Sequence, residues 1–355
     1  MANSARIALD ATYSLGHALS GVGLYSHEIL YGLAAAQPET RFEFCYRTHR
    51  YLRARRLERP ANVRLRLLAE PLGPRSADLF HGLNQRLPRI SLRRSVATFH
   101  DLFVMTGEYS TPEFRARFTE QARDAAARAD AIIAVSEFTR QQVISLLGVA
   151  PERVHVVHHG IRRLAAPAPS PPLAQGSAAR QQVILNVGAI QARKNIARLV
   201  EAFEAVGPSW QLVLAGSSGF GAAEILARIG SSAARDRIHV TGYVSPEELA
   251  AWYGRASVFA FPSLDEGFGM PVLEAMAAGV PVITSNRSAL PEVAGDAAML
   301  VDPEETGALA DALRALTLNV DLQRDYARRG LARAQLFTWE KAVSQTWRLY
   351  RSLLP

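Results

Sequence analysis

Two glutamates and two glycines between residues 265 and 274 have the types and spacing of a binding site for phosphate and hydroxyl groups. Glu266, Gly267 and Gly269 directly follow an apolar stretch, and Glu274 comes a turn into the helix expected to start at Pro271. Glycines let backbone N–H groups approach a ligand closely, and a helix start favours an anion. The two carboxylates would repel a phosphate, so we expect them to accept hydrogen bonds from hydroxyls beside it. A phosphate flanked by hydroxyls indicates a nucleotide sugar.

Short apolar segments that alternate with helical patterns must position these residues. The expected strands are residues 6–9, 42–46, 63–67, 96–99, 131–135, 154–157, 183–187, 212–215, 238–241, 258–261 and 280–284. The expected helices are residues 24–36, 114–129, 138–147, 196–205, 222–229, 246–253, 271–278 and 306–315. Strand–helix alternation of this kind predicts parallel sheets covered by helices on both faces.

The alternation stops and restarts around residues 164–179, which contain four prolines and no charge, as is typical of a linker. We therefore predict an α/β fold of two Rossmann-like, doubly wound domains, residues 1–163 and 180–338, that face each other across a cleft. A C-terminal helix over residues 339–355 is expected to pack back towards the N-terminal domain. Ligands bind such sheets outside the carboxyl ends of the strands.

Composition excludes several classes of protein. The chain has 355 residues, of which 48% are hydrophobic and 21% charged, values typical of a folded globular protein. It has no apolar run long enough to span a membrane and no signal-peptide pattern at its start, so we expect a cytoplasmic protein. The single cysteine, Cys45, excludes an internal disulfide and a multi-cysteine metal site.

The net charge of +7 is concentrated in one segment, because eight arginines and one acidic residue lie from Arg47 to Arg66. One interpretation is docking to an anionic membrane surface, which would make the protein peripheral at the inner face of the cytoplasmic membrane. The other is a solvated face of an arginine-rich protein. No nucleic-acid-binding motif accompanies the charge, so we expect no nucleic-acid partner.

Five motifs in a fixed order carry a family resemblance. The Glu266–Glu274 spacing with Gly-Phe-Gly inside it resembles the signature of family 4 glycosyltransferases, which have the two-Rossmann GT-B fold. The other four are Gly21-Val22-Gly23, His100-Asp101-Leu102, Ser136-Glu137-Phe138-Thr139-Arg140 and Arg193-Lys194-Asn195. The resemblance extends from Asp10 to about Trp347. Within the family the chain looks most like the mannosyltransferase-B-like subgroup, bacterial enzymes that extend surface polysaccharides such as O-antigen.

The resemblance implies roles for the second-domain residues. Arg193 and Lys194 would bind the donor's diphosphate and neutralise the charge that grows on the leaving group. Glu274 would accept hydrogen bonds from the ribose diol, and Glu266 from hydroxyls of the transferred sugar. The backbone of Gly267, Phe268 and Gly269 would contact the phosphate, and backbone near Gly216 and Val244 would hold the base.

At one position the chain departs from many relatives. They carry an arginine directly after the glycine that corresponds to Gly188, whereas this chain has Ala189. We expect Arg193 to substitute for that arginine in binding the diphosphate.

First-domain candidates also follow from the resemblance. His100 would contact the donor sugar near the reacting carbon, and Asp101 would orient its ring or cap the next segment. Gly21 and Gly23 would lie close to the diphosphate and the acceptor. Ser136 is either a site residue or a helix cap, and His81 either lines the acceptor side or is structural.

The function that we predict is a retaining transfer of a hexose, with mannose favoured, from a nucleotide sugar to a glycan or lipid-linked glycan acceptor. GDP-mannose is the favoured donor, and no cofactor is expected. The chain has no Asp-x-Asp pair, so we also predict that no metal takes part. The alternatives are a nucleotide-sugar epimerase or a phosphorylase on the same fold, and a non-catalytic nucleotide-sugar-binding protein. A nicotinamide dehydrogenase is disfavoured because no strand is followed by Gly-x-Gly-x-x-Gly.

Overall fold

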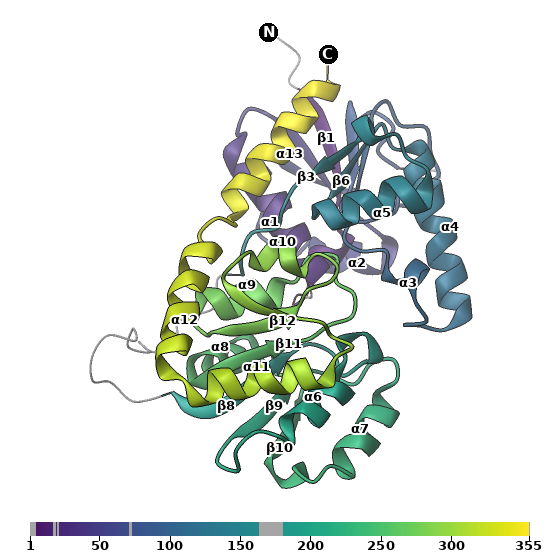
Figure 1. Ribbon diagram of the computed structural model, residues 1–355. Coiled ribbons are helices and arrows are strands. Elements are labelled where there is room, and N and C mark those ends of the chain that lie inside the picture. The colour runs from purple at the N-terminus through teal and green to yellow at the C-terminus, as the bar shows by residue number, and fades with distance from the viewer. Residues whose placement is uncertain (1–4, 17–18, 20, 71–72, 163–179, 355) are drawn as a thin grey trace. The chain divides into compact units, whose positions relative to one another are not determined.

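The computed structural model describes residues 5–16, 19, 21–70, 73–162 and 180–354 (Figure 1). The chain forms two compact units. The first comprises Met1–Thr106, Pro112–Gly160 and Thr338–Pro355, and the second comprises Gly107–Thr111 and Ile161–Phe337. The predicted linker, residues 164–179, lies outside the described residues.

The first unit is built on a seven-stranded, entirely parallel sheet with the order β3-β2-β1-β4-β5-β6-β7. Its strands are β1 (Arg6–Asp10), β2 (Arg41–Tyr46), β3 (Val63–Leu67), β4 (Leu79–Gly82), β5 (Ser95–Phe99), β6 (Ala131–Ala134) and β7 (Val154–Val156). Its α-helices are α1 (Gly21–Ala36), α2 (Thr48–Ala54), α3 (Phe103–Thr106), α4 (Pro112–Arg128), α5 (Glu137–Leu147) and α13 (Trp339–Leu353), and α13 packs on α1.

The second unit repeats this plan with six parallel strands in the order β10-β9-β8-β11-β12-β13. Its strands are β8 (Gln181–Val187), β9 (Gln211–Ala215), β10 (Ile238–Gly242), β11 (Ala256–Phe261), β12 (Val282–Ser285) and β13 (Ala298–Val301). Its α-helices are α6 (Ile196–Phe203), α7 (Ala222–Gly230), α8 (Pro246–Arg255), α9 (Met270–Ala277), α10 (Leu290–Ala294), α11 (Thr306–Leu318) and α12 (Val320–Ala334).

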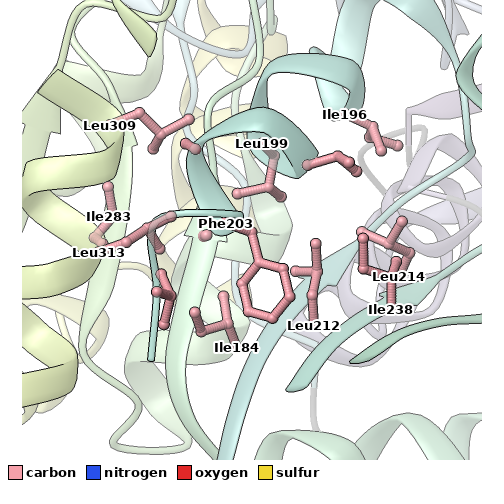
Figure 2. Packing of buried hydrophobic residues seen from close by; sticks show 14 of the residues in the cluster. Ile184, Ile196, Leu199, Phe203, Leu212, Leu214, Ile238, Ile283, Leu309 and Leu313 are labelled. Atoms are coloured by element: carbon pink, nitrogen blue, oxygen red, sulfur yellow. The ribbon is translucent and has the colours of Figure 1, made fainter. Parts of the chain in front are cut away.

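Helix α6 shows how the second core forms. Its apolar residues recur at the helical period and make one stripe, formed by Ile196, Leu199, Val200 and Phe203. Figure 2 shows Leu199 and Phe203 pointing towards Ile184 and Leu212 of the sheet, with Leu313 of α11 beside them. Burying each large apolar side chain contributes roughly 1.5–3 kcal/mol, so this packing anchors the start of α6 and the loop before it.

Some expected elements differ from the observed ones. The first helix begins at Gly21, so the expected start at residue 24, which left Gly21 and Gly23 before the helix, was wrong. A Cβ at Gly23 would lie 3.0 Å from the carbonyl oxygen of Tyr13, so close packing accounts for this glycine in a helix. Strand β4 was missed because His81 and a glycine interrupt its four residues. Helix α12 was missed because its buried stripe consists of small residues, Ala327, Gly330 and Ala334.

In the part of the chain that the structure describes, no helix is both long and apolar enough to cross a lipid bilayer.

Candidate active site

The loops after β8 and β11 meet at the point where the second sheet reverses its strand order. Strand β8 pairs with β9 on one side and with β11 on the other. The chain therefore continues from β8 towards one side of the sheet and from β11 towards the other. Crevices that bind ligands form at such switch points. The 3-10 helix Ala192–Lys194 follows β8, and the backbone N–H of Leu264, after β11, donates to the carbonyl oxygen of Arg193 at 2.9 Å.

Arg193, Lys194 and Glu266 form a buried cluster at this point. The Lys194 ammonium donates to Glu266 Oε1, and Arg193 Nη1 lies 3.0 Å from Glu266 Oε2. Arg193 also donates to the carbonyl oxygen of Asp265. Each of the three charged residues is less than a tenth exposed. Burial raises the pKa of Glu266, but the two cations outweigh it and bring this pKa to about 2. Glu266 is therefore a carboxylate at neutral pH, and the three side chains carry one excess positive charge.

Local backbone geometry holds Lys194 in this place. Asn195 ends the 3-10 helix in the left-handed conformation, with φ of 58°. Its side-chain amide donates to the carbonyl oxygens of Pro262, at 3.1 Å, and Pro303, at 2.6 Å. The Lys194 ammonium lies 4.6 Å from the centre of the Phe261 ring, a favourable cation–π contact. The position of the ammonium is therefore set before any ligand binds.

The glycine-containing loop after Glu266 is anchored from both sides. The backbone N–H of Glu266 donates to Ser288 Oγ at 3.1 Å. Gly269 caps α9 with φ of 109°, a conformation that favours glycine, and Pro271 lies in the first helical turn. The ring of Phe268 is buried and contacts Phe337 with ring centres 5.9 Å apart.

Glu274 forms a second buried cluster on the same loop–helix segment. Its Oε2 accepts a hydrogen bond from the Tyr253 hydroxyl at 3.0 Å, and its Oε1 lies 3.0 Å from Arg162 Nε. Glu274 is 3% exposed, and this burial raises its pKa, against the opposing effects of Arg162 and Tyr253. The two glutamates therefore differ: Glu266 is held as an ion by two cations, and Glu274 shares its carboxylate between one cation and a phenol.

Gly216 and Val244 follow β9 and β10 at the same edge of the sheet. Gly216 is bridged to Gly242, and a Cβ at Gly216 would collide with the carbonyl of Gly188. Only a glycine at position 216 therefore allows its backbone to approach that of Gly188 so closely. Val244 is half-buried and directly precedes the capping box that starts α8.

In the first unit, His100 directly follows β5. Its Nε2 donates to the carbonyl oxygen of Leu83 at 3.0 Å, and its Nδ1 lies 3.4 Å from His159 Nε2. Burial lowers the pKa of His100 to about 4, so the imidazole is neutral at pH 7. Asp101, the next residue, is half-buried.

The remaining first-unit candidates have structural contacts. Ser136 caps α5, and its Oγ accepts a hydrogen bond from the backbone N–H of Thr139 at 3.0 Å. His81 is fully buried in β4, where its Nε2 lies 2.8 Å from Thr98 Oγ1 and its Nδ1 bonds the Tyr350 hydroxyl.

Three residues of these clusters were missed by sequence reasoning: Arg162, Tyr253 and Ser288. Arg162 follows the His-His-Gly-Ile segment at the end of the first-domain pattern, and that position was the one available signal. Tyr253 and Ser288 lie in ordinary helical and turn patterns, so nothing in the sequence distinguishes them.

Comparison with known proteins establishes the family. Residues 13–163 match the family model described as Glycosyltransferase Family 4, and residues 174–333 match the model described as Glycosyl transferases group 1. The O-antigen chain mannosyltransferase B of Escherichia coli is 31% identical over 379 residues, covering 97% of this chain and 99% of that protein. The chain therefore belongs to the family 4 glycosyltransferases, as the motifs predicted.

Solved structures show the same fold. Sucrose-phosphate synthase from Thermosynechococcus elongatus matches with a TM-score of 0.80 at 24% identity, over 98% of this chain and 99% of that one. Anabaena Alr3699/HepE in complex with UDP-glucose matches with a TM-score of 0.71 at 19% identity, over 99% of each chain. The predicted fold class, two Rossmann-like parallel-sheet domains of the GT-B type, is confirmed.

Proposed function

We propose that this glycosyltransferase is a retaining, metal-independent hexosyltransferase that moves mannose from GDP-mannose to a glycan or lipid-linked glycan acceptor in bacterial surface polysaccharide synthesis. The observation that carries the proposal is the buried cluster of Arg193, Lys194 and Glu266 at the switch point of the second sheet. The choice of mannose and of surface polysaccharide is supported by the near full-length similarity to the Escherichia coli O-antigen mannosyltransferase.

The cluster has the charges that a sugar diphosphate requires. Arg193 offers a planar guanidinium fork to phosphate oxygens and Lys194 a compact point charge. Both would stabilise the negative charge that develops on the departing nucleoside diphosphate. Glu266 stays ionised, so it can accept hydrogen bonds from hydroxyls of the transferred sugar while it keeps both cations in position. In this arrangement the two cations would stabilise the diphosphate charge, as a metal ion does in other transferases.

The other second-unit residues would hold the nucleoside. Glu274 would accept hydrogen bonds from the ribose diol, with Tyr253 orienting its carboxylate. The closely approaching backbone near Gly216 and Val244 would contact the base, and the loop from Gly267 to Gly269 would contact the phosphate.

The proposed reaction replaces one bond at the anomeric carbon of the donor sugar by another. The bond from the anomeric carbon to the diphosphate oxygen breaks, and the acceptor hydroxyl attacks the same face of the sugar. The hydroxyl proton passes to the leaving phosphate oxygen. Because the attack is on the same face, an α-donor gives an α-linkage. His100, neutral at pH 7, would hydrogen-bond the donor sugar near the reacting carbon.

Product analysis tests this proposal. The protein is incubated with GDP-mannose or UDP-glucose and a mannose-terminated oligosaccharide, and proton NMR follows the anomeric signals. We expect transfer from GDP-mannose with an α-linked product and stoichiometric release of GDP. Sugar inversion without acceptor would favour the epimerase, and tight donor binding without release of GDP would favour a non-catalytic binding protein.

We further propose that α2, the loop after it and β3 contact an anionic membrane. Of the eight arginines of this segment, Arg50 donates to the carbonyl oxygens of Thr12 and Leu15, and Arg66 pairs with Glu43, so these two are structural. Five others are exposed and have no ion-pair partner among the described residues, namely Arg53, Arg55, Arg56, Arg59 and Arg64. Leu52 and Leu57 beside them are 70% and 44% exposed. Basic residues near an anionic surface contribute about 1 kcal/mol each, and the leucines would enter the interface.

Vesicle sedimentation tests this contact. The protein should sediment with phosphatidylcholine vesicles that contain phosphatidylglycerol and not with phosphatidylcholine alone. The double variant Arg53→Glu/Arg56→Glu should lower the binding constant at least about tenfold, whereas Arg235→Glu in the second unit should not. Equal binding to neutral and anionic vesicles would contradict an electrostatic contact.

A further inference from the structure

A cavity of about 330 Å³ lies in the first unit, outside the carboxyl ends of β2, β3 and β4. Arg47 directly follows β2, Leu68 directly follows β3, and Arg86 lies in the loop after β4. Because these strands are parallel, the three residues share one edge of the sheet, the edge at which doubly wound folds bind ligands. Gln121 and Asp124 of α4 close the other side.

Two arginines of this cavity, Arg47 and Arg86, act on the buried carboxyl of Asp10 only from a distance: burial raises the pKa of Asp10, and the charges of both arginines lower it by less. Among the described residues, neither Arg47 nor Arg86 forms an ion pair, and the Nε of Arg47 is buried without a hydrogen-bond acceptor. A buried guanidinium N–H without an acceptor costs free energy unless a ligand or water satisfies it. A third arginine, Arg89, also lines the cavity, and its guanidinium donates to Glu120 on the exposed surface at 3.4 Å.

The acidic residues nearby are already engaged. Arg128 donates to both carboxylate oxygens of Asp124, at 3.0 and 2.6 Å. Glu70 accepts a hydrogen bond from the backbone N–H of Arg89 at 2.9 Å. Asp10 at the end of β1 is 2% exposed, and its Oδ1 accepts from the backbone N–H of Thr12 at 3.0 Å. Asp10 senses the charge of both Arg47 and Arg86, but among the described residues no carboxylate forms an ion pair with either guanidinium, so their forks stay available for an anion.

We propose that this cavity binds a phosphate group carried by the acceptor. The inference rests on the proposed function, because it assigns the chemical class of the acceptor of that reaction. Guanidinium forks match phosphate oxygens in a planar, two-bond geometry, and a phosphate would supply the acceptor that Arg47 Nε lacks. A neutral sugar offers no charge to two arginines that form no ion pair among the described residues, so a phosphate-bearing acceptor fits the cavity better.

Isothermal titration of the protein tests the site with two probes, inorganic phosphate and geranyl phosphate. We expect both to bind, and each of the variants Arg47→Ala and Arg86→Ala to weaken binding of both at least about tenfold. Arg86→Lys should weaken it less, because it keeps the charge but loses the fork. Tighter binding of geranyl phosphate would assign the phosphate to a lipid carrier, and equal affinity would assign recognition to the phosphate group alone.

Two controls locate the binding. Arg41→Ala removes an exposed arginine at the opposite end of the strand that precedes Arg47, and it should leave affinity unchanged. Lys194→Ala removes a cation of the donor cluster, and the phosphate binding that depends on Arg47 and Arg86 should persist in this variant. The proposal is overturned if Arg47→Ala and Arg86→Ala bind both probes like the parent chain, if Arg41→Ala weakens binding equally, or if Lys194→Ala abolishes it.

GDP titrations separate this inference from the proposed function. Arg86→Ala should bind GDP as the parent chain does. Loss of phosphate binding with intact GDP binding supports the acceptor cavity. If the parent chain binds geranyl phosphate but neither GDP nor GDP-mannose, the proposed donor fails while the phosphate site stands.

Discussion

The two units share a strand order but use buried polar groups in opposite ways. In each sheet the first three strands build outward on one side of the first strand, the fourth returns to its other side, and each sheet has candidate site residues at its carboxyl edge. In the first unit the buried candidate residues are imidazoles, His81 and His100, with His159 beside His100, and burial lowers the pKa of each. In the second unit the buried groups are ions, with Glu266 between two cations. The shared topology therefore places both edges, and the side chains decide whether the buried candidate residues there are neutral imidazoles or paired ions.

The largest expected effect of this difference is on stability. Glu266→Ala leaves Arg193 and Lys194 buried without their counter-ion, which should lower the free energy of unfolding by roughly 3–5 kcal/mol. Glu304→Ala removes an exposed partner of Arg287 and should cost less than about 1 kcal/mol. Urea denaturation of both variants measures the comparison. Equal costs would mean that the buried cluster is no more important than a surface ion pair.

The units should also respond differently to acid. The pKa of His81 is lowered to about 3 and that of His100 to about 4, both from 6.5. As pH falls, these histidines are therefore protonated in the unfolded chain before they are protonated in the folded one. Their contribution to stability is complete above pH 6.5 and is lost as pH falls towards 4 and 3, at roughly 1.4 kcal/mol per pH unit for each histidine. The pKa of Glu266 is lowered from 4.5 to about 2, so its contribution is lost only between those values. Burial raises the pKa of Glu274, so its protonation in acid removes the free-energy cost of burying a charged carboxylate.

Hydrogen exchange at pH 7 and pH 5, corrected for intrinsic rates, checks this order. Amides of β4 and β5 should lose protection at pH 5 while those of β8 and β11 keep it. His100→Gln should reduce the pH dependence of unfolding by about one proton. Earlier loss of protection in the second unit would contradict the assignment of neutral histidines to the first.

A smaller effect is expected at the hydrogen bond that ties α13 to the first sheet. Tyr350→Phe leaves His81 Nδ1 buried without its partner and should cost about 1–3 kcal/mol. Tyr243→Phe is the matched control, because that tyrosine is 62% exposed, and its change should be within about 0.5 kcal/mol. Thermal unfolding of both variants measures the difference, and an unaltered melting temperature for Tyr350→Phe would show that this bond does not stabilise the first unit.

Sequence reasoning predicted the repeated features of the fold better than its exceptions. Large apolar residues at a regular period mark α6 and β8, and the alternation of such segments was enough to predict two parallel sheets. Strand β4 and helix α12 escaped because a buried histidine and a stripe of small residues do not produce that signal.

The candidate site was predictable to a similar degree. The order of motifs assigned Arg193, Lys194 and Glu266 to one ligand, and they lie in one cluster. The ion pairing among them was not predicted, because it depends on the pairing of β8 with β11. The contacts of Glu274 with Arg162 and Tyr253 depend on how α8 and α9 pack, which spacing along the chain does not encode.

Turnover of the Lys194→Ala variant tests the central claim most directly. The account holds that the buried ammonium stabilises the leaving diphosphate, so the rate of GDP release from GDP-mannose with acceptor should fall at least about tenfold. Lys341→Ala, which changes the one other lysine of the chain, should stay within about twofold of the parent rate. A Lys194→Ala variant that is folded and turns over at the parent rate would contradict the account.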